Sequence, residues 1–105
     1  MFPQRLSSVL DIGAGGGRNA AALAAQGHRV VAAEPARELR ELGERLHVGQ
    51  DIEWVEDALS DLAILRRRER RFDLILMAAV WMHLDAEQRS AAMPHLVGLL
   101  DAGVG

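Results

Sequence analysis

The sequence predicts an α/β fold in which helices cover both faces of a parallel sheet, and two observations support this prediction. Short apolar segments of strand length alternate along the 105 residues with segments whose apolar residues recur at helical spacing. The connections between successive strands are too short for anything but crossovers, which makes neighbouring strands parallel. No repeat, linker or low-complexity segment divides the chain, so residues 1–105 are predicted to form a single domain.

The first strand and the first helix are predicted on either side of a glycine cluster. Residues 8–12 form an apolar run that leads into Gly13, which is typical of a buried strand entering a tight turn. Residues 18–26 are rich in alanine and are followed by Gly27, a residue type that commonly stops helices. A strand, a tight turn and a helix therefore open the fold.

A second strand and a second helix follow directly. Residues 28–34 are short and β-branched at their centre, and Pro35 ends them. Residues 36–46 are predicted to be helical because apolar side chains recur there at helical spacing, namely Leu39, Leu42 and Leu46.

The second half of the chain continues the alternation. Residues 52–56 alternate apolar and acidic side chains, as expected of a strand near the edge of a sheet. Residues 59–70 are predicted to hold a short helix, and residues 72–80 form a nearly continuous apolar strand of the kind that is covered on both faces. Asp85, with Gln88 three residues later, predicts the start of the last helix.

Composition limits the classes of function. Hydrophobic residues make up 50% of the chain and charged residues 26%, a balance typical of folded domains. The net charge of −3 argues against binding to nucleic acid or to anionic membranes, because both require a basic surface. The absence of cysteine excludes disulfides and thiolate zinc sites, and the histidines lack ligand-like spacing, so no metal site is expected. No segment approaches the ~20 apolar residues of a membrane span, which predicts a cytoplasmic protein.

The glycine cluster is the strongest functional signal. A glycine-rich turn after a strand lets a ligand approach the backbone and directs the free N–H groups of the next helix at it. Gly13, Gly15 and Gly17 alternate with other residues, and Asp11 stands two residues before the first of them. Arg18 occupies the position at which the dinucleotide fingerprint requires its third glycine, which disfavours a nicotinamide cofactor.

This pattern resembles the first motif of class I S-adenosylmethionine-dependent methyltransferases, and the resemblance extends over nearly the whole chain. Glu34, followed by Pro35, stands where that family has an acid at the end of its second strand. Asp57, followed by Ala58, stands where an acid follows the third strand, and residues 72–84 match the fourth motif. The resemblance implies a partial class I methyltransferase fold, a Rossmann-like sheet with strand order 3-2-1-4.

The resemblance also implies a cofactor, S-adenosylmethionine, with S-adenosylhomocysteine as the product. Asp11 and the glycine turn would hold the methionine part, Glu34 the ribose hydroxyls and Asp57 the adenine. The fourth motif lacks the N-P-P-Y sequence of many adenine and glutamine methyltransferases, which favours a small molecule as methyl acceptor. The implied cofactor-binding residues are Asp11, Gly13, Ala14, Gly15, Gly17, Glu34, Pro35, Asp57, Ala58, Ala79, Val80 and Trp81.

Purely structural interpretations of these residues remain open. Asp11 and Glu34 could be polar strand ends, and Asp57 could cap the helix that follows it. His83 is the titratable group next to the expected methyl position and hence a candidate base, but a packed connection explains it better. The catalytic residues are therefore left unassigned.

The resemblance further implies a domain truncated after its fourth strand and helix, with little or no activity of its own. Residues 99–103 are similar to the family's turn into a fifth strand. Without that strand, residues 72–80 would form an open apolar edge, which predicts pairing with a second copy as a homodimer through this strand, exchange of elements between copies, or aggregation, and hence a dimer or larger species. Two other functions stay open: the NAD(P)-binding domain of a reductase, and a non-catalytic cofactor-binding module.

Overall fold

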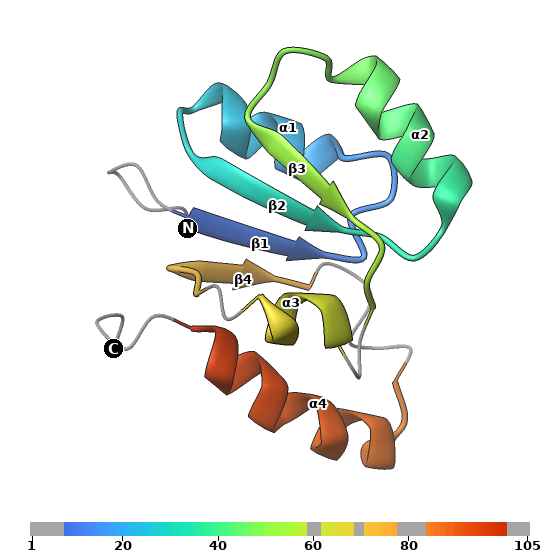
Figure 1. Cartoon of the computed structure of the whole chain (residues 1–105), viewed down its shortest axis with the longest axis vertical. Helices are drawn as coiled ribbons and strands as arrows, with labels where there is room; N and C mark the ends of the chain where they lie inside the picture. Colours follow the sequence, from blue (N-terminus) through green and yellow to red (C-terminus); the bar gives the residue numbers. More distant parts are fainter. Residues whose placement is uncertain (1–7, 59–61, 69–70, 78–83, 101–105) are drawn as a thin grey trace.

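The structure is a computed structural model that describes residues 8–58, 62–68, 71–77 and 84–100. In this part of the chain four parallel strands form one sheet of order β3-β2-β1-β4 (Figure 1), as the sequence predicts. Strand β1 lies inside the sheet, and its last residue, Ile12, pairs with Ala33 of β2. The strands are β1 (Ser8–Ile12), β2 (Arg29–Ala33), β3 (Ile52–Val55) and β4 (Leu74–Leu76).

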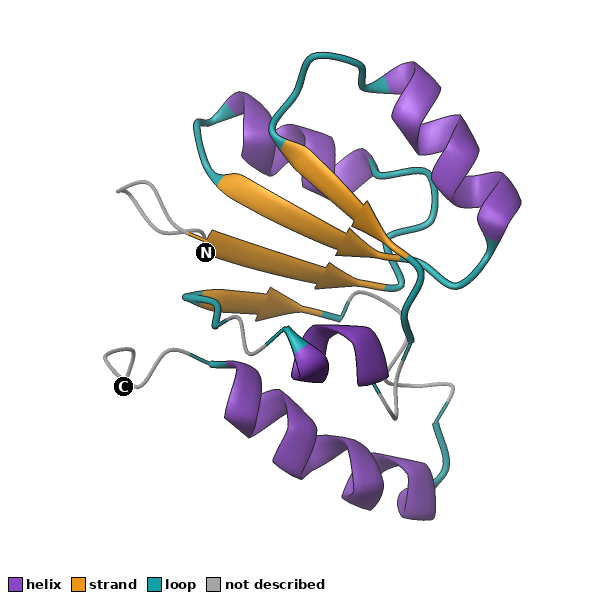
Figure 2. Ribbon diagram, in the orientation of Figure 1, coloured by secondary structure: helices purple, strands orange, loops and turns teal. Residues whose placement is uncertain are grey.

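The helices form two layers, one on each face of the sheet (Figure 2). They are α1 (Arg18–Ala25), α2 (Arg37–Leu46), α3 (Ala63–Arg67) and α4 (Ala86–Leu99). Helices α1 and α2 contact β3 on one face, while α3 packs against α4 on the other. Among the described residues, no helix has the length and apolar character needed to cross a membrane.

The two faces of the sheet have cores of different character, because alternate strand residues point to opposite faces. The face under α3 and α4 is packed with large side chains, among them Phe72, Leu65 and Leu96. The face under α1 is packed mainly with smaller ones: Val9, Ala20, Leu23, Val30 and Ala32. The glycine turn and α1 therefore rest on a thin core.

Trp54 of β3 fills the space beside this thin core. Its side chain packs against the cluster of buried residues that contains Val9 and Leu23. A Cβ atom on either Gly17 or Gly43 would overlap the six-membered ring of Trp54. Glycine at these two positions lets the start of α1 and the middle of α2 approach the indole ring.

Local signals for helix ends are confirmed. Gly27 adopts a φ of 98° directly after the C-cap of α1, a left-handed conformation that suits glycine. At the start of α4 the side chain of Asp85 accepts a hydrogen bond from the backbone N–H of Gln88, while the Gln88 side chain accepts one from the backbone of Asp85. This reciprocal pair is the capping box that the sequence predicts.

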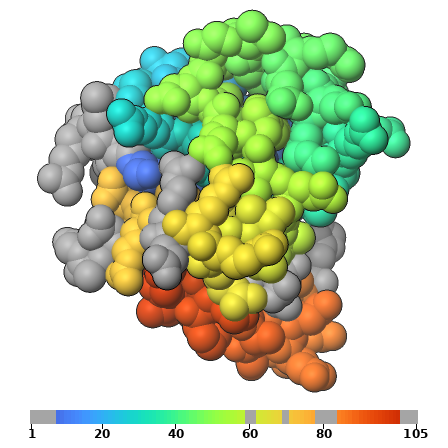
Figure 3. Space-filling model, viewed as in Figure 1, coloured from blue at the N-terminus to red at the C-terminus, as the bar shows by residue number. Residues whose placement is uncertain are grey.

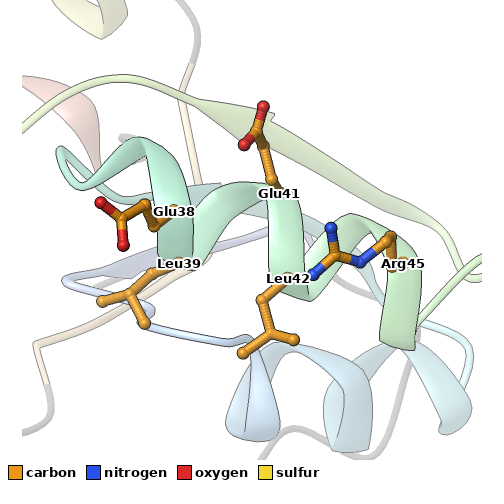
Figure 4. Close-up of a pocket in the computed structure, with 5 residues that line it drawn as sticks. All are labelled: Glu38, Leu39, Glu41, Leu42 and Arg45. Carbon is orange, nitrogen blue, oxygen red and sulfur yellow. The ribbon is translucent and has the colours of Figure 1, made fainter.

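The apolar face of α2 is more exposed than its pattern of leucines suggests. Leu39, Leu42 and Leu46 have exposed fractions of 40%, 37% and 63%. Figure 4 shows Leu39 and Leu42 on one side of the helix and Glu41 on the other. In the space-filling view α2 lies at one end of the long axis and α4 at the other (Figure 3). Helical spacing identified the helix correctly but could not show whether another element covers it.

The described part of the fourth strand is shorter than the predicted range of residues 72–80. Strand β4 covers only Leu74–Leu76, and Phe72 forms a separate parallel bridge with Leu100. The end of the predicted strand, residues 78–80, lies outside the described residues. The predicted helix within residues 59–70 is α3, a single short turn of helix beginning at Ala63.

Candidate functional site

Three acidic residues lie at or just beyond the carboxyl ends of β1, β2 and β3. Asp11 is the next-to-last residue of β1, Glu34 directly follows β2, and Asp57 follows β3 by two residues. Because the strands are parallel and in register, these ends lie together at one edge of the sheet. All three side chains are buried, which is unusual for carboxylates and requires partners for their oxygens.

The turn between β1 and α1 is hydrogen-bonded to the last residue of β2. The backbone N–H groups of Gly13 and Ala14 both donate to the carbonyl oxygen of Ala33, at 2.8 and 3.2 Å. Gly15 has a φ of +59°, and a Cβ atom there would meet no atom of the described residues within 4 Å. The turn thus leaves open space above Gly15, which is where a ligand can approach the backbone.

Glu34 ties this glycine turn to the turn that follows β2. Its Oε1 accepts a hydrogen bond of 2.7 Å from the N–H of Gly15, and its Oε2 accepts one of 3.0 Å from the N–H of Ala36. Its exposed fraction is 6%, so it is not a solvated strand end. Carboxylate oxygens have further lone pairs, so the same group can also accept hydrogen bonds from a bound diol.

Asp11 lies deeper in the site and lacks a full set of partners. Its exposed fraction is 1%, and its Oδ1 has no hydrogen-bond partner among the described residues. Burial, and then the neighbouring charge of Glu34, raise the pKa of Asp11 to about 6. A buried acceptor without a donor calls for an explanation, and a ligand donor supplies one.

Among the described residues, Asp57 accepts hydrogen bonds only from those that follow it within the loop and helix after β3. Its Oδ2 accepts a buried hydrogen bond of 3.0 Å from the N–H of Leu65, in the first turn of α3, and its Oδ1 accepts from Ala58 at 3.1 Å. The capping role that the sequence allowed is therefore realised. A contact between Asp57 and an adenine stays a prediction.

Arg40 of α2 is a member of the site that sequence reasoning missed. Its Nη1 donates to the carbonyl oxygens of Glu34 and Pro35, at 2.8 and 3.0 Å, and its side chain is only 14% exposed. The available signal was its place early in α2, because helical side chains lean toward the N-terminus and can reach the strand end before the helix.

The remaining predicted site residues fall into three groups. Gly17 is buried at the N-cap of α1, with the ring of Trp54 beside its Cβ position. Pro35 is exposed and Ala58 is half-buried, both next to acids of the site. Four predicted residues lie outside the described part of the chain: Ala79, Val80, Trp81 and His83.

Comparison with known proteins identifies the family. The sequence model of the family described as "Methyltransferase domain" matches residues 9–103, nearly the whole chain. The chain belongs to this family. The resemblance to class I S-adenosylmethionine-dependent methyltransferases is thereby confirmed. The chain has no match among curated protein sequences.

Solved methyltransferase structures share the fold of this methyltransferase domain. A TehB-like SAM-dependent methyltransferase from Corynebacterium glutamicum is 31% identical, with a TM-score of 0.81 over 97% of this chain and 53% of that one. A 1,6-didemethyltoxoflavin-N1-methyltransferase from Burkholderia thailandensis is 32% identical, with a TM-score of 0.72 over 91% of this chain and 41% of that one.

A third structure shows the fold alone. The magnesium protoporphyrin IX methyltransferase of Synechocystis PCC 6803 is 22% identical, with a TM-score of 0.77 over 93% of this chain and 47% of that one. The chain therefore spans between 41% and 53% of the length of these three proteins.

Proposed function

We propose that this methyltransferase domain binds S-adenosylmethionine at the edge formed by the carboxyl ends of β1, β2 and β3, and that it serves methyl transfer to a small-molecule acceptor. The buried carboxylate of Glu34, bonded to Gly15 of the glycine turn, is the observation that carries this proposal. It places a charged acceptor beside a turn with open space above its backbone.

The residues present fit this cofactor. The Oδ1 of Asp11, which has no partner among the residues that the structure describes, offers a buried acceptor, and the amino group at the methionine end of the cofactor is a matching donor. Glu34 would accept from the ribose hydroxyls through the lone pairs that Gly15 and Ala36 leave free. Asp57 and the N–H of Ala58 would border the adenine.

When bound, S-adenosylmethionine would supply a methyl group carried on a sulfonium: a lone pair of the acceptor would form a bond to the methyl carbon, in line with the C–S bond, which would break with its electron pair going to sulfur and leave S-adenosylhomocysteine. The protein's part is alignment and exclusion of water. The structure of the Burkholderia relative has bound 1,6-didemethyltoxoflavin together with S-adenosylhomocysteine. This bound compound supports a small molecule as acceptor.

Calorimetry with S-adenosylhomocysteine and NADH tests the proposed ligand. We expect measurable binding of S-adenosylhomocysteine and none of NADH, since Arg18 stands in place of the third glycine of a dinucleotide fingerprint. Tighter binding of NADH would identify a reductase domain instead. Cofactor binding without methyl transfer to any acceptor would favour a non-catalytic module.

We also propose that the chain associates through the outer edge of β4, as a homodimer. Within the described residues this strand pairs with β1 on one side, and on its other side Phe72 bridges Leu100. Unpaired N–H and C=O groups of an apolar edge favour pairing with a second strand. Light scattering across a concentration series tests this, and a monomer at all concentrations would contradict it.

A further inference from the structure

The guanidinium of Arg40 joins three groups at the carboxyl edge of the sheet. Nη1 bonds the carbonyl oxygens of two successive residues, Glu34 and Pro35. Nη2 lies 3.6 Å from Oε1 of Glu56, the residue after β3, whose side chain is 70% exposed. One side chain of α2 therefore links the end of β2 with the end of β3.

These contacts act on the residue that faces the ribose in the proposed function. The backbone N–H of Glu34 donates to the carbonyl of Val55 at 2.9 Å, and its carbonyl oxygen accepts from Arg40 at 2.8 Å. The backbone of Glu34 is thus held on both sides. With the backbone fixed, the carboxylate can reach Gly15 and Ala36 at the same time.

Arginine suits this task better than lysine does. Its planar guanidinium presents several N–H donors in a fixed fork, so it can bond two carbonyls and approach a carboxylate in one orientation. Lysine would keep the charge, but its ammonium on a flexible stem has no rigid fork that holds one nitrogen at the two carbonyls while a second faces Glu56. The side chain of Arg40 is 14% exposed, whereas that of Arg37, one turn earlier, is 81% exposed. Arg40 is therefore committed to these contacts in a way that Arg37 is not.

We propose that Arg40 is a positioning residue of the cofactor site, which holds the turn after β2 so that the carboxylate of Glu34 meets the cofactor ribose. This inference rests on the proposed function. Arg40 does not itself contact the cofactor in this proposal, so any effect of Arg40 on the affinity must pass through Glu34. A residue that acted by its charge alone would be replaced well by lysine and would affect S-adenosylhomocysteine and the positively charged S-adenosylmethionine to different extents.

The test is a double-mutant cycle, with the affinity for S-adenosylhomocysteine measured by calorimetry. Arg40→Ala should weaken binding about tenfold, and Arg40→Lys should recover little of this loss, because charge without the fork does not fix two carbonyls. On a Glu34→Ala background, Arg40→Ala should change the affinity by less than about twofold, since coupled residues are not additive. The affinity of Arg40→Ala for S-adenosylmethionine, which carries an extra positive charge, should fall by the same factor as its affinity for S-adenosylhomocysteine.

Two controls accompany the cycle. Arg37→Ala removes an exposed arginine that pairs with Glu41 at 3.3 Å, and it should leave the affinity unchanged. Glu56→Gln removes the negative charge beside Nη2 but keeps an acceptor oxygen, and it should also leave the affinity unchanged, because an exposed pair at 3.6 Å contributes little compared with the two carbonyl bonds of Nη1. Thermal unfolding of every variant shows that the chain is folded, and if Arg40→Ala does not fold, Arg40→Lys carries the test.

Four outcomes would overturn the inference. Wild-type affinity in the folded Arg40 variants would remove Arg40 from the site. Full rescue by Arg40→Lys, or a selective loss of S-adenosylhomocysteine over S-adenosylmethionine, would assign it a charge effect only. An equal loss of affinity from Arg40→Ala in the wild type and on the Glu34→Ala background would show that Arg40 does not act through Glu34. Wild-type affinity in Glu34→Ala would contradict the proposed function itself, which is a distinct result.

Discussion

The carboxyl ends of β2 and β3 each carry a buried acid, and the two acids are used differently. Glu34 accepts from Gly15 and Ala36, so it connects the turn after β1 with the turn after β2. Asp57 accepts from the neighbouring Ala58 and from Leu65, so it closes its own loop onto α3. Both oxygens of each carboxylate are engaged, but only Glu34 bonds the glycine turn.

This difference separates a binding role from a structural one. The bonds of Glu34 are part-buried, next to the open space above Gly15, so water or a ligand can replace them. The bond from Leu65 to Asp57 is fully buried, where nothing replaces a lost acceptor. We therefore expect changes at the end of β2 to affect affinity, and changes at the end of β3 to affect stability.

The largest expected effect is that of Gly15→Val on cofactor binding. A branched side chain would fill the space in which no atom of the described part of the chain lies within 4 Å of the Cβ position, so we expect affinity for S-adenosylhomocysteine to fall about a hundredfold or more. The positive φ adds a folding cost of about 1–2 kcal/mol.

Gly49→Val is the matched control, because Gly49 has a φ of +88°, equally open surroundings and a place before β3, at the opposite edge. It should show a comparable folding cost and unchanged affinity. Normal binding by Gly15→Val, measured by calorimetry, would mean that the glycine turn is not the cofactor cradle.

The next effect concerns stability at the end of β3. Asp57→Ala leaves the N–H of Leu65 buried without an acceptor, so we expect a loss of about 2–3 kcal/mol in the free energy of unfolding. Glu34→Ala should cost less, about 1 kcal/mol, because water can reach its donors. Urea denaturation of both variants measures this, and the reverse order would contradict the contrast between the two acids.

Asp11 gives a pH-dependent effect. Its pKa is about 6 in the folded protein and near 3.8 in the unfolded chain. Between these two pH values the folded state binds more protons at Asp11 than the unfolded state does, so the free energy of unfolding falls as the pH rises. Asp11→Asn should remove this decline and be more stable than the wild type at pH 7.5 by about 1–3 kcal/mol, with little difference at pH 4. Urea denaturation at both pH values tests this. An equal difference at both would show that ionisation of Asp11 does not matter.

Much of the fold was predictable because its signals are local. The glycine turn, the stop at Gly27 and the capping box at Asp85 each depend on a few neighbouring residues, and the structure contains all three. Burial of α2 was not predictable, since spacing shows that Leu39 and Leu42 share a face but not what covers it.

The candidate site was predictable only in part, for a related reason. Asp11 lies near the end of β1, Glu34 and Asp57 follow β2 and β3, and parallel strands bring such residues to one edge. Arg40 was missed because its partners are carbonyl oxygens, which every residue has and no side-chain pattern reveals. The choice between cap and ligand contact at Asp57 likewise depended on which N–H groups lie beside it.

The affinity of Glu34→Ala for S-adenosylhomocysteine, measured by calorimetry beside that of the wild type, tests the proposed site most directly. Loss of hydrogen bonds to a charged group should weaken binding by roughly 1.5–3 kcal/mol, while the exposed control Glu44→Ala on α2 should bind as the wild type does. Equal affinity of Glu34→Ala and the wild type, with both proteins folded, would show that the end of β2 does not hold the ribose and would contradict the site proposed at this edge.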